Sequence, residues 1–142
     1  MMKISLIFIE SMLLNKSLGG VQIGDSRDKV IQYFGEPLDF LPQKKKNKAI
    51  FSYGALQLYL LDGTLRGFTF DSQKIAFFET VFLFEKIYLS DFLFFLDEKK
   101  INYESDDRIF FQTGKVIKVH KSFYFCFAED VLMVFGFSQD AD

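Results

Sequence analysis

Residues 56–69, LQLYLLDGTLRGFT, constrain the fold more than any other part of the chain. Asp62-Gly63 is a strong two-residue hairpin signal, because a type I′ turn needs positive φ at both central positions. Apolar residues alternate with others on both sides of the turn, as in strands that bury one face. The pairs expected on the core face are Leu60 with Leu65, Leu58 with Gly67, and Leu56 with Thr69.

A second hairpin is predicted near the carboxyl end, over SFYFCFA and VLMVFGF. Glu129-Asp130 is a weaker turn signal than Asp-Gly, but the length fits. The expected pairs are Phe127 with Leu132, Phe125 with Val134, and Phe123 with Gly136. The opposite face would then also be apolar, which predicts a central hairpin covered on both sides; its residues are Cys126, Met133, Tyr124 and Phe135.

The stretch VQIGDSRDKVIQYFGEP, residues 21–37, predicts a short helix. Asp25 and Ser26 are both N-cap residue types. Gly35 suits the position after the last turn, and Pro37 forbids continuation. We expect a helix of about nine to ten residues. Capping and termination account for the residue types at its two ends, so the glycines before the helix are not taken as a phosphate-binding loop.

A second helix is predicted to begin at Ser90. Leu89 before it and Phe94 at the fourth helical position would form a hydrophobic staple. Asp91 lies at the positive end of the helix dipole. Asn102 is the expected left-handed stop, and the polar run ESDDR that follows is expected to be a loop.

The two halves of the chain repeat one pattern: a capped helix, a polar loop and a hairpin. Further strands are expected within 73–88, at IFFQ (109–112) and at KVIKVH (115–120). A chain of 142 residues fits one domain, 1–142. We therefore predict an α+β fold, an antiparallel sheet with helices packed on one face, formed by two pseudo-repeat units over about 20–72 and 88–138.

Composition limits the partners and the compartment. Twenty phenylalanines and no tryptophan predict a thick aromatic core. The net charge of -2 argues against direct nucleic-acid binding. The single cysteine fits a reducing compartment.

Glu10 interrupts the short apolar run near the amino end, and no apolar window is long enough to span a membrane. We expect a cytoplasmic monomer or weak homo-oligomer without a membrane partner.

No catalytic group is predicted. His120 and Cys126 are the only residues of their types, and on one continuous strand they would lie roughly 20 Å apart, although a bend near Lys121-Ser122 would change that distance. That separation is too long for a nucleophile–base pair. The acidic residues of ESDD do not match the spacing of a calcium loop, and no phosphate-loop or dinucleotide fingerprint occurs. We therefore expect a protein that is not an enzyme and that uses no metal or cofactor.

Two charged segments could bind a partner. The lysine run at 44–48 (Lys44, Lys45, Lys46, Lys48) is interpreted as a solvated loop, because the chain is acidic overall and no aromatic residues interleave. An acidic cluster at the end of the second helix is the better candidate, either as plain solubility or as a patch that steers in a basic partner. Its residues are Asp97, Glu98, Tyr103, Glu104, Asp106 and Asp107.

The pattern I-x-G-x-S-x-x-x-V, a helix, a Gly-x-Pro exit and a Y-G-x-L-x-L strand turning at Asp-Gly resembles a recurring bacterial unit. It is similar to the helix-plus-sheet unit of small outer-membrane-assembly lipoproteins and of tandem β-lactamase inhibitor proteins. It looks still more like small immunity proteins of polymorphic or contact-dependent growth inhibition toxin systems. YLSDFLFFLDEKKINYES also resembles the second helix and following strand of such proteins.

The resemblance implies an immunity protein that neutralises a cognate toxin domain, a basic domain such as a nuclease, by stoichiometric occlusion. The interpretation as a lipoprotein is weakened. Such proteins need a cysteine directly after a signal peptide, and the single cysteine of this chain lies at position 126. The alternative is a structural or assembly module that binds a peptide or a strand edge. No binding residues carry over, since immunity surfaces vary with their toxins.

Overall fold

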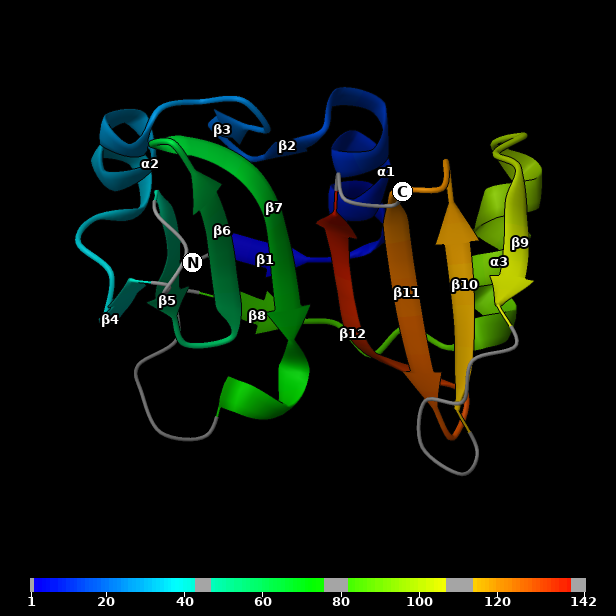
Figure 1. Ribbon diagram of the computed structural model, residues 1–142. Coiled ribbons are helices and arrows are strands. Elements are labelled where there is room, and N and C mark those ends of the chain that lie inside the picture. The colour runs from blue at the N-terminus through cyan, green and yellow to red at the C-terminus, as the bar shows by residue number, and fades with distance from the viewer. Residues whose placement is uncertain (1, 43–46, 76–81, 107–113, 139–142) are drawn as a thin grey trace.

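The computed structural model describes residues 2–42, 47–75, 82–106 and 114–138, which fold as α+β with a mostly antiparallel sheet (Figure 1). Eight strands form this sheet in the order β4-β5-β6-β7-β12-β11-β10-β9. Their bounds are β4 Asp39–Pro42, β5 Lys48–Tyr53, β6 Leu56–Leu61, β7 Thr64–Asp71, β9 Tyr103–Asp106, β10 Lys115–Val119, β11 Phe123–Ala128 and β12 Val131–Ser138.

Three α-helices pack on one face of the sheet, as predicted, and lie behind it in Figure 1; they are α1 Leu6–Asn15, α2 Arg27–Phe34 and α3 Leu89–Glu98. Aromatic contacts join each helix to a strand residue on that face. The ring centroids are 5.9 Å apart for Phe8 and Phe70, 5.3 Å for Phe34 and Tyr53, and 4.7 Å for Phe92 and Phe125. The phenylalanine-rich composition therefore fills the layer between the helices and the sheet.

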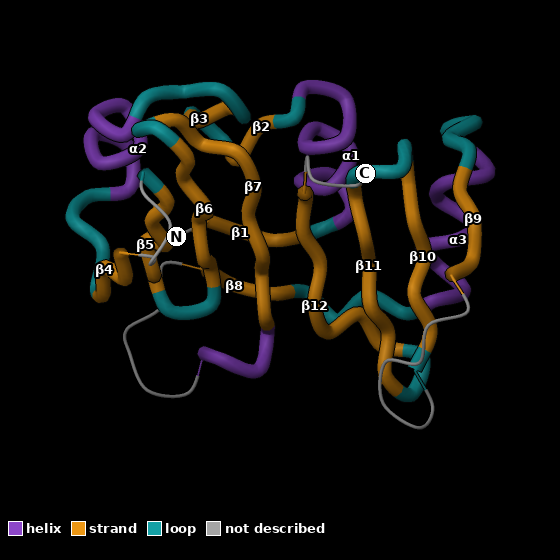
Figure 2. The backbone as a smooth tube through the Cα atoms, in the orientation of Figure 1, coloured by secondary structure: helices purple, strands orange, loops and turns teal. Residues whose placement is uncertain are grey.

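The amino-terminal segment, for which no structure was predicted, contributes to that core. β1 Met2–Ile4 pairs in parallel with β8 Phe82–Phe84 behind the large sheet, as the tube in Figure 2 also shows. α1 follows directly, and its N-cap Ser5 accepts a hydrogen bond from the Phe8 amide. The short strands β2 Ser17–Leu18 and β3 Val21–Gln22 then lead into α2.

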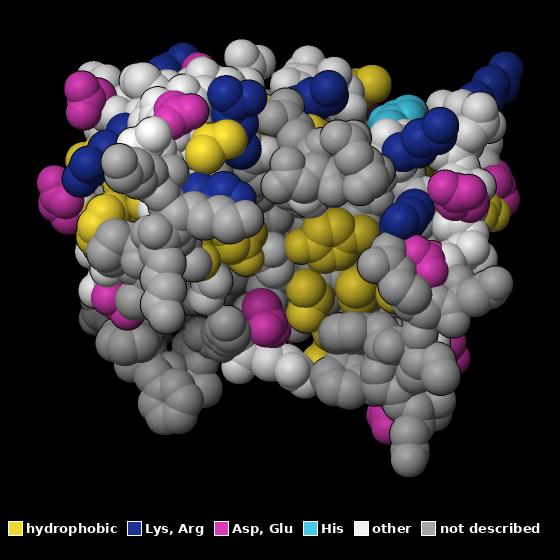
Figure 3. Space-filling model, in the orientation of Figure 1, with side chains coloured by type: hydrophobic (Ala, Val, Ile, Leu, Met, Phe, Trp, Pro, Cys, Tyr) yellow, Lys and Arg dark blue, Asp and Glu magenta, His cyan; other side chains and the backbone are white. Residues whose placement is uncertain are grey.

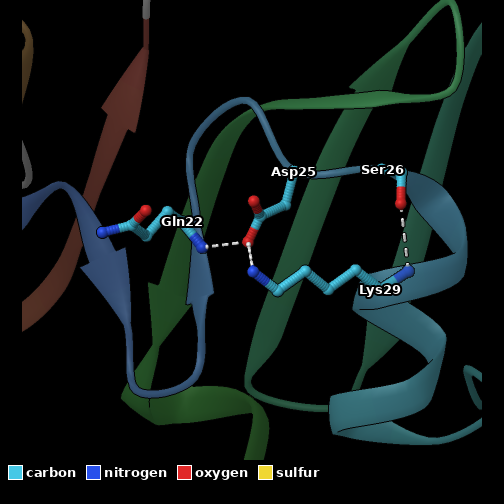
Figure 4. Close-up of polar contacts among 4 residues, drawn as sticks. All are labelled: Gln22, Asp25, Ser26 and Lys29. Carbon is cyan, nitrogen blue, oxygen red and sulfur yellow. Dashed lines mark hydrogen bonds and ion pairs between the residues drawn. The ribbon is translucent and has the colours of Figure 1, made fainter.

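The capped helix in the first half is confirmed over Arg27–Phe34, slightly shorter than expected. Ser26 is its N-cap, and its Oγ accepts a hydrogen bond from the Lys29 amide at 3.2 Å (Figure 4). Asp25 has a different role: its Oδ2 accepts from the Gln22 amide at 2.7 Å and pairs with Lys29 Nζ at 3.3 Å (Figure 4). Gly35 follows the helix with φ of 87°. Polar contacts within the segment thus account for the start of the helix.

The helix in the second half begins one residue earlier than predicted, with Tyr88 as an N-cap that forms no side-chain cap bond. Phe94 is 69% exposed, so the predicted hydrophobic staple with Leu89 does not form. The left-handed residue after the helix is Lys100, with φ of 58°, and not Asn102. The helix-covered side instead buries Phe92, Phe95 and Leu96.

The first hairpin is confirmed, but its predicted register holds for only one of the three pairs. Asp62 and Gly63 both have positive φ, 53° and 71°, as a type I′ turn requires. Leu60 pairs with Leu65, and a bulge then adds Arg66 to the returning strand. Because a bulge shifts the register by one residue, Leu58 pairs with Phe68 and Leu56 with Phe70, while Gly67 lies opposite Tyr59.

The second hairpin departs from prediction in the same way. Glu129 and Asp130 have φ of 50° and 64°, and Phe127 pairs with Leu132 as expected. After the bulge, Phe125 pairs with Phe135 and Phe123 with Phe137. Phe135 is consequently buried on the helix-covered face, whereas it had been placed on the opposite one. In each hairpin the bulge follows the second pair from the turn.

Several other segments differ from the prediction. The expected loop after the second helix contains strand β9, and the lysine-rich segment is flanked by β4 and β5. Within 73–88 the described residues belong to a 3-10 turn, Ser72–Ile75, and to β8 with the residues that follow it; the partner of β8 is the distant strand β1. The strand expected at 109–112 and the residues Lys44, Lys45 and Lys46 lie outside the described residues.

Candidate binding face

The side of the eight-stranded sheet opposite the helices is here termed the open face, because no described helix lies over it (Figure 1). Figure 3 looks onto this face, where hydrophobic side chains gather over the middle strands among charged ones. Since alternate residues of a strand point to opposite sides, the residues next to the buried phenylalanines face outward here. They include Ile50, Gln57, Tyr59, Thr69, Tyr124, Cys126, Val134, Lys118, Glu104 and Asp106.

Three hydroxyl groups meet at the centre of the open face. The Tyr59 hydroxyl donates to Thr69 Oγ1 at 3.2 Å, and Thr69 Oγ1 lies 2.8 Å from the Tyr124 hydroxyl. Tyr124 is on β11 and Thr69 is on β7, so the bond passes over β12 at Gly136. Burial raises the pKa of Tyr124, while its hydrogen bond to Thr69 opposes that rise.

A depression of about 470 Å³ lies beside this hydroxyl cluster. Lys48, Arg66, Ile50 and Tyr59 are among the residues that line it. The bulge positions Arg66 next to Gly67, which has no side chain to fill the floor. Sequence reasoning missed this feature, because the bulge decides which residues line it and no local signal marked the bulge.

The far edge of the open face is acidic. Glu104 and Asp106 lie on β9 and pair with Lys118 and Val116 of β10. The Lys118 Nζ is 3.4 Å from Asp106 Oδ2. Lysine and arginine line the depression at one side of the sheet, and carboxylates lie at the other beside Lys118. Asp71 lies between these regions on the same face, opposite Val134.

The predicted acidic patch is divided between two sides of the molecule. Tyr103 is half-buried against the core, so Glu104 and Asp106 point to the open face. Asp97 and Glu98 are exposed at the end of α3, which packs on the helix-covered side. Asp107 lies outside the described residues. The structure thus brings Glu104 and Asp106 together but does not join them to Asp97 and Glu98 on one face.

His120 and Cys126 do not lie on one strand, so the separation of roughly 20 Å expected for a continuous strand does not apply, and the chain turns near the position considered for a bend. His120 and Lys121, with φ of 54° and 65°, reverse the chain between β10 and β11. Cys126 pairs with Val116, three residue pairs beyond the Val119–Phe123 pair, or about 10 Å along the strands. That distance is still beyond hydrogen-bond reach for a catalytic pair.

The described ranges contain no group of three or more His, Cys, Asp or Glu side chains arranged to hold a metal ion. In the same ranges, no helix combines the length and apolar character needed to cross a bilayer.

Comparison with known proteins adds one point about the fold. No protein-family model matches the chain, and no curated protein matches it. A solved structure of an extracellular protein containing an SCP domain, from Bacillus anthracis strain Ames, is similar with a TM-score of 0.52 and 12% identity. The similarity covers 84% of this chain and 44% of that one. It therefore concerns the fold alone, over less than half of that protein.

Proposed function

We propose that this protein is an immunity protein, a non-enzymatic binder that neutralises a cognate bacterial toxin domain by stoichiometric occlusion. The observation that carries the proposal is the open face, a broad sheet surface backed by an aromatic core. A surface held by regular strands loses little conformational freedom on binding. Tyrosine, which stands at its centre, and arginine, which lies to one side, are residue types enriched at binding hot spots.

The charges on the open face would determine which side of it a basic partner approaches. The acidic edge at Glu104 and Asp106 would attract a basic toxin domain, such as a nuclease with a positively charged groove, and Lys48 and Arg66 would repel it from the opposite side. Asp97 and Glu98 would act only through long-range steering, since they lie on α3. A cytoplasmic location belongs to this proposal, because an immunity protein must meet the toxin where it acts.

The proposal includes the two pseudo-repeat units at about 20–72 and 88–138. The strand order supports it, because each half contributes four consecutive strands. Bridges from Ser26 to Thr64 and from Tyr88 to Val131 join the helix N-cap to the last strand in both halves. Thr69 and Gly136 pair where β7 meets β12. Under this interpretation the open face is a composite of two units, with its centre at that pair.

Binding to the toxin domain encoded beside this protein's gene tests the function. We expect a one-to-one complex by size-exclusion chromatography and calorimetry, and growth protection on co-expression. Glu104→Arg should weaken binding at least about tenfold, while Gln32→Arg, an exposed position on α2, should not. Absence of both binding and protection would overturn the immunity proposal. A loss with Asp97→Arg but not with Glu104→Arg would place the interface on the helix side and overturn the role of the open face.

The second candidate is an assembly module that adds a peptide strand to the sheet. The position of β9 favours it, because among the described residues β9 pairs with β10 alone and is the last strand of the sheet. Extended peptides bind such edges through main-chain hydrogen bonds. Changes confined to the β9 amide signals on titration with a peptide, without toxin binding, would favour this function.

A further inference from the structure

The depression on the open face contains features of a small-molecule site and is independent of the toxin-binding proposal. Its volume of about 470 Å³ lies within the usual range for ligand pockets. Residues from β5, β6, β7, β11 and β12 line it, so its walls are regular strands held by the core.

Gly67 lies in the lining of the depression, where β7 and β12 approach each other closely. A Cβ at position 67 would lie 2.7 Å from the Phe137 carbonyl oxygen, so no larger residue fits without moving the backbone. Tyr59, directly opposite Gly67, therefore has no neighbouring side chain from that residue. The Tyr59 ring instead lies beside the glycine, with Cδ2 3.7 Å from the position that a Cβ would take.

The charged groups among the described lining residues are both positive. Lys48 and Arg66 line the depression, and the lining residues that the structure describes include no aspartate or glutamate. Within the described part of the chain, neither cation forms an ion pair. Arginine can bind a carboxylate or phosphate through two parallel hydrogen bonds, and lysine adds a second positive charge.

The hydroxyl cluster supplies a further donor. Tyr59, Thr69 and Tyr124 carry three O–H groups, and two hydrogen bonds join them. One hydroxyl hydrogen is thus left over by these bonds, whichever way the Thr69–Tyr124 bond is oriented. Ile50 and Leu61, together with the tyrosine rings, supply apolar surface next to these polar groups.

We propose that this depression binds a small organic anion, with its carboxylate or phosphate between Lys48 and Arg66 and its apolar body against Ile50 and Tyr59. Two cations that form no ion pair within the described residues, a donor hydroxyl and an apolar wall match such a ligand. A neutral ligand of the same shape would gain no attraction from the two cations.

The test is a titration of the isotope-labelled full chain with phenyl phosphate and with benzoate, followed by amide NMR. Benzyl alcohol serves as the neutral control. We expect saturable shifts at Arg66, Gly67 and Thr69 with at least one of the anions and not with benzyl alcohol. Lys48→Gln and Arg66→Gln should each weaken binding about tenfold, the usual loss for one charge-assisted hydrogen bond.

Lys115→Gln is the matched control, because Lys115 begins β10 as Lys48 begins β5 but does not line the depression. It should bind as the unmodified protein does, and thermal unfolding should confirm that all three variants are folded. Failure of both anions to bind, equal binding of benzyl alcohol, or an equal loss in Lys115→Gln would overturn the proposal. Binding of an acidic peptide alone would also overturn it in favour of a protein ligand. None of these outcomes depends on the toxin.

Discussion

The Tyr124 hydroxyl lies 2.8 Å from Thr69 Oγ1, and the two residues stand on strands separated by β12. Gly136 makes this contact possible. Its backbone lies beneath the hydroxyl, and a Cβ there would collide with the Tyr124 hydroxyl and with the Phe68 carbonyl oxygen. The two hairpins are thus joined on the open face by a side-chain hydrogen bond, at a point where the sheet tolerates only glycine.

Gly136→Ala should lower the free energy of unfolding by about 1–3 kcal/mol, as overpacking in a well-packed site typically does. The backbone collision with Phe68 requires β7 and β12 to separate, and the collision with Tyr124 displaces its hydroxyl. Urea unfolding monitored by circular dichroism measures the change.

The same substitution in a Tyr124→Ala background separates the two causes. Alanine removes the hydroxyl and the ring carbon Cζ, which would lie 2.8 Å from the added Cβ, but leaves the Phe68 carbonyl in place, so most of the cost of Gly136→Ala should persist. If the cost vanishes in that background, close approach of β7 and β12 is not the reason for the glycine.

Local signals predicted local structure well. The Asp62-Gly63 turn and the Ser26 cap depend on residues within a few positions of each other, and both were confirmed. The registers beyond the turns were not, because each bulge adds a residue, Arg66 or Met133, that has no special turn chemistry. One added residue exchanges the faces of all that follow.

The binding face was harder to predict than the hairpins. Thr69 and Tyr124 are separated by 55 positions in sequence and meet only because β7 and β12 pair at the middle of the sheet. The acidic cluster was selected as consecutive residues, but strand alternation sends Tyr103 inward and Glu104 outward. Helix α3 holds Asp97 away from both on the other side.

Phe92→Ala should cost about 3–5 kcal/mol, the usual range for removing a buried aromatic side chain. The Phe92 ring is fully buried, 4.7 Å from the Phe125 ring and 5.4 Å from that of Phe127, centroid to centroid. Phe94→Ala on the same helix is the control and should change stability by less than about 0.5 kcal/mol, since the ring is exposed. Equal costs in thermal unfolding would mean that α3 packs through a different side.

Ser26→Ala should destabilise the protein by about 1 kcal/mol, because the Lys29 amide loses its side-chain acceptor. Ser90→Ala should be neutral or slightly stabilising, because Ser90 lies inside α3 and alanine has the higher helix propensity. Denaturant midpoints of the two variants provide the measurement. A comparable loss in Ser90→Ala would restore Ser90 as a cap and contradict the assignment to Tyr88.

Tyr53 should make the fold less stable in alkaline solution. Its hydroxyl donates to the Gly35 carbonyl at 2.9 Å, and burial, with a smaller contribution from the negative charge of Glu36, raises its pKa to about 12. An unfolded tyrosine ionises near pH 10, so between about pH 10 and 12 the unfolded chain releases a proton that the folded one retains. Stability should therefore fall as the pH rises through this window.

Tyr53→Phe should cost about 1 kcal/mol at pH 7 through the lost hydrogen bond. The stability of this variant should nevertheless decline less steeply above about pH 10 than that of the unmodified protein. Glu36→Gln should reduce the slope only slightly, because burial is the larger cause. Urea unfolding from pH 7 to 11 measures all three proteins, and an equally steep decline in Tyr53→Phe would assign the alkaline loss to other groups.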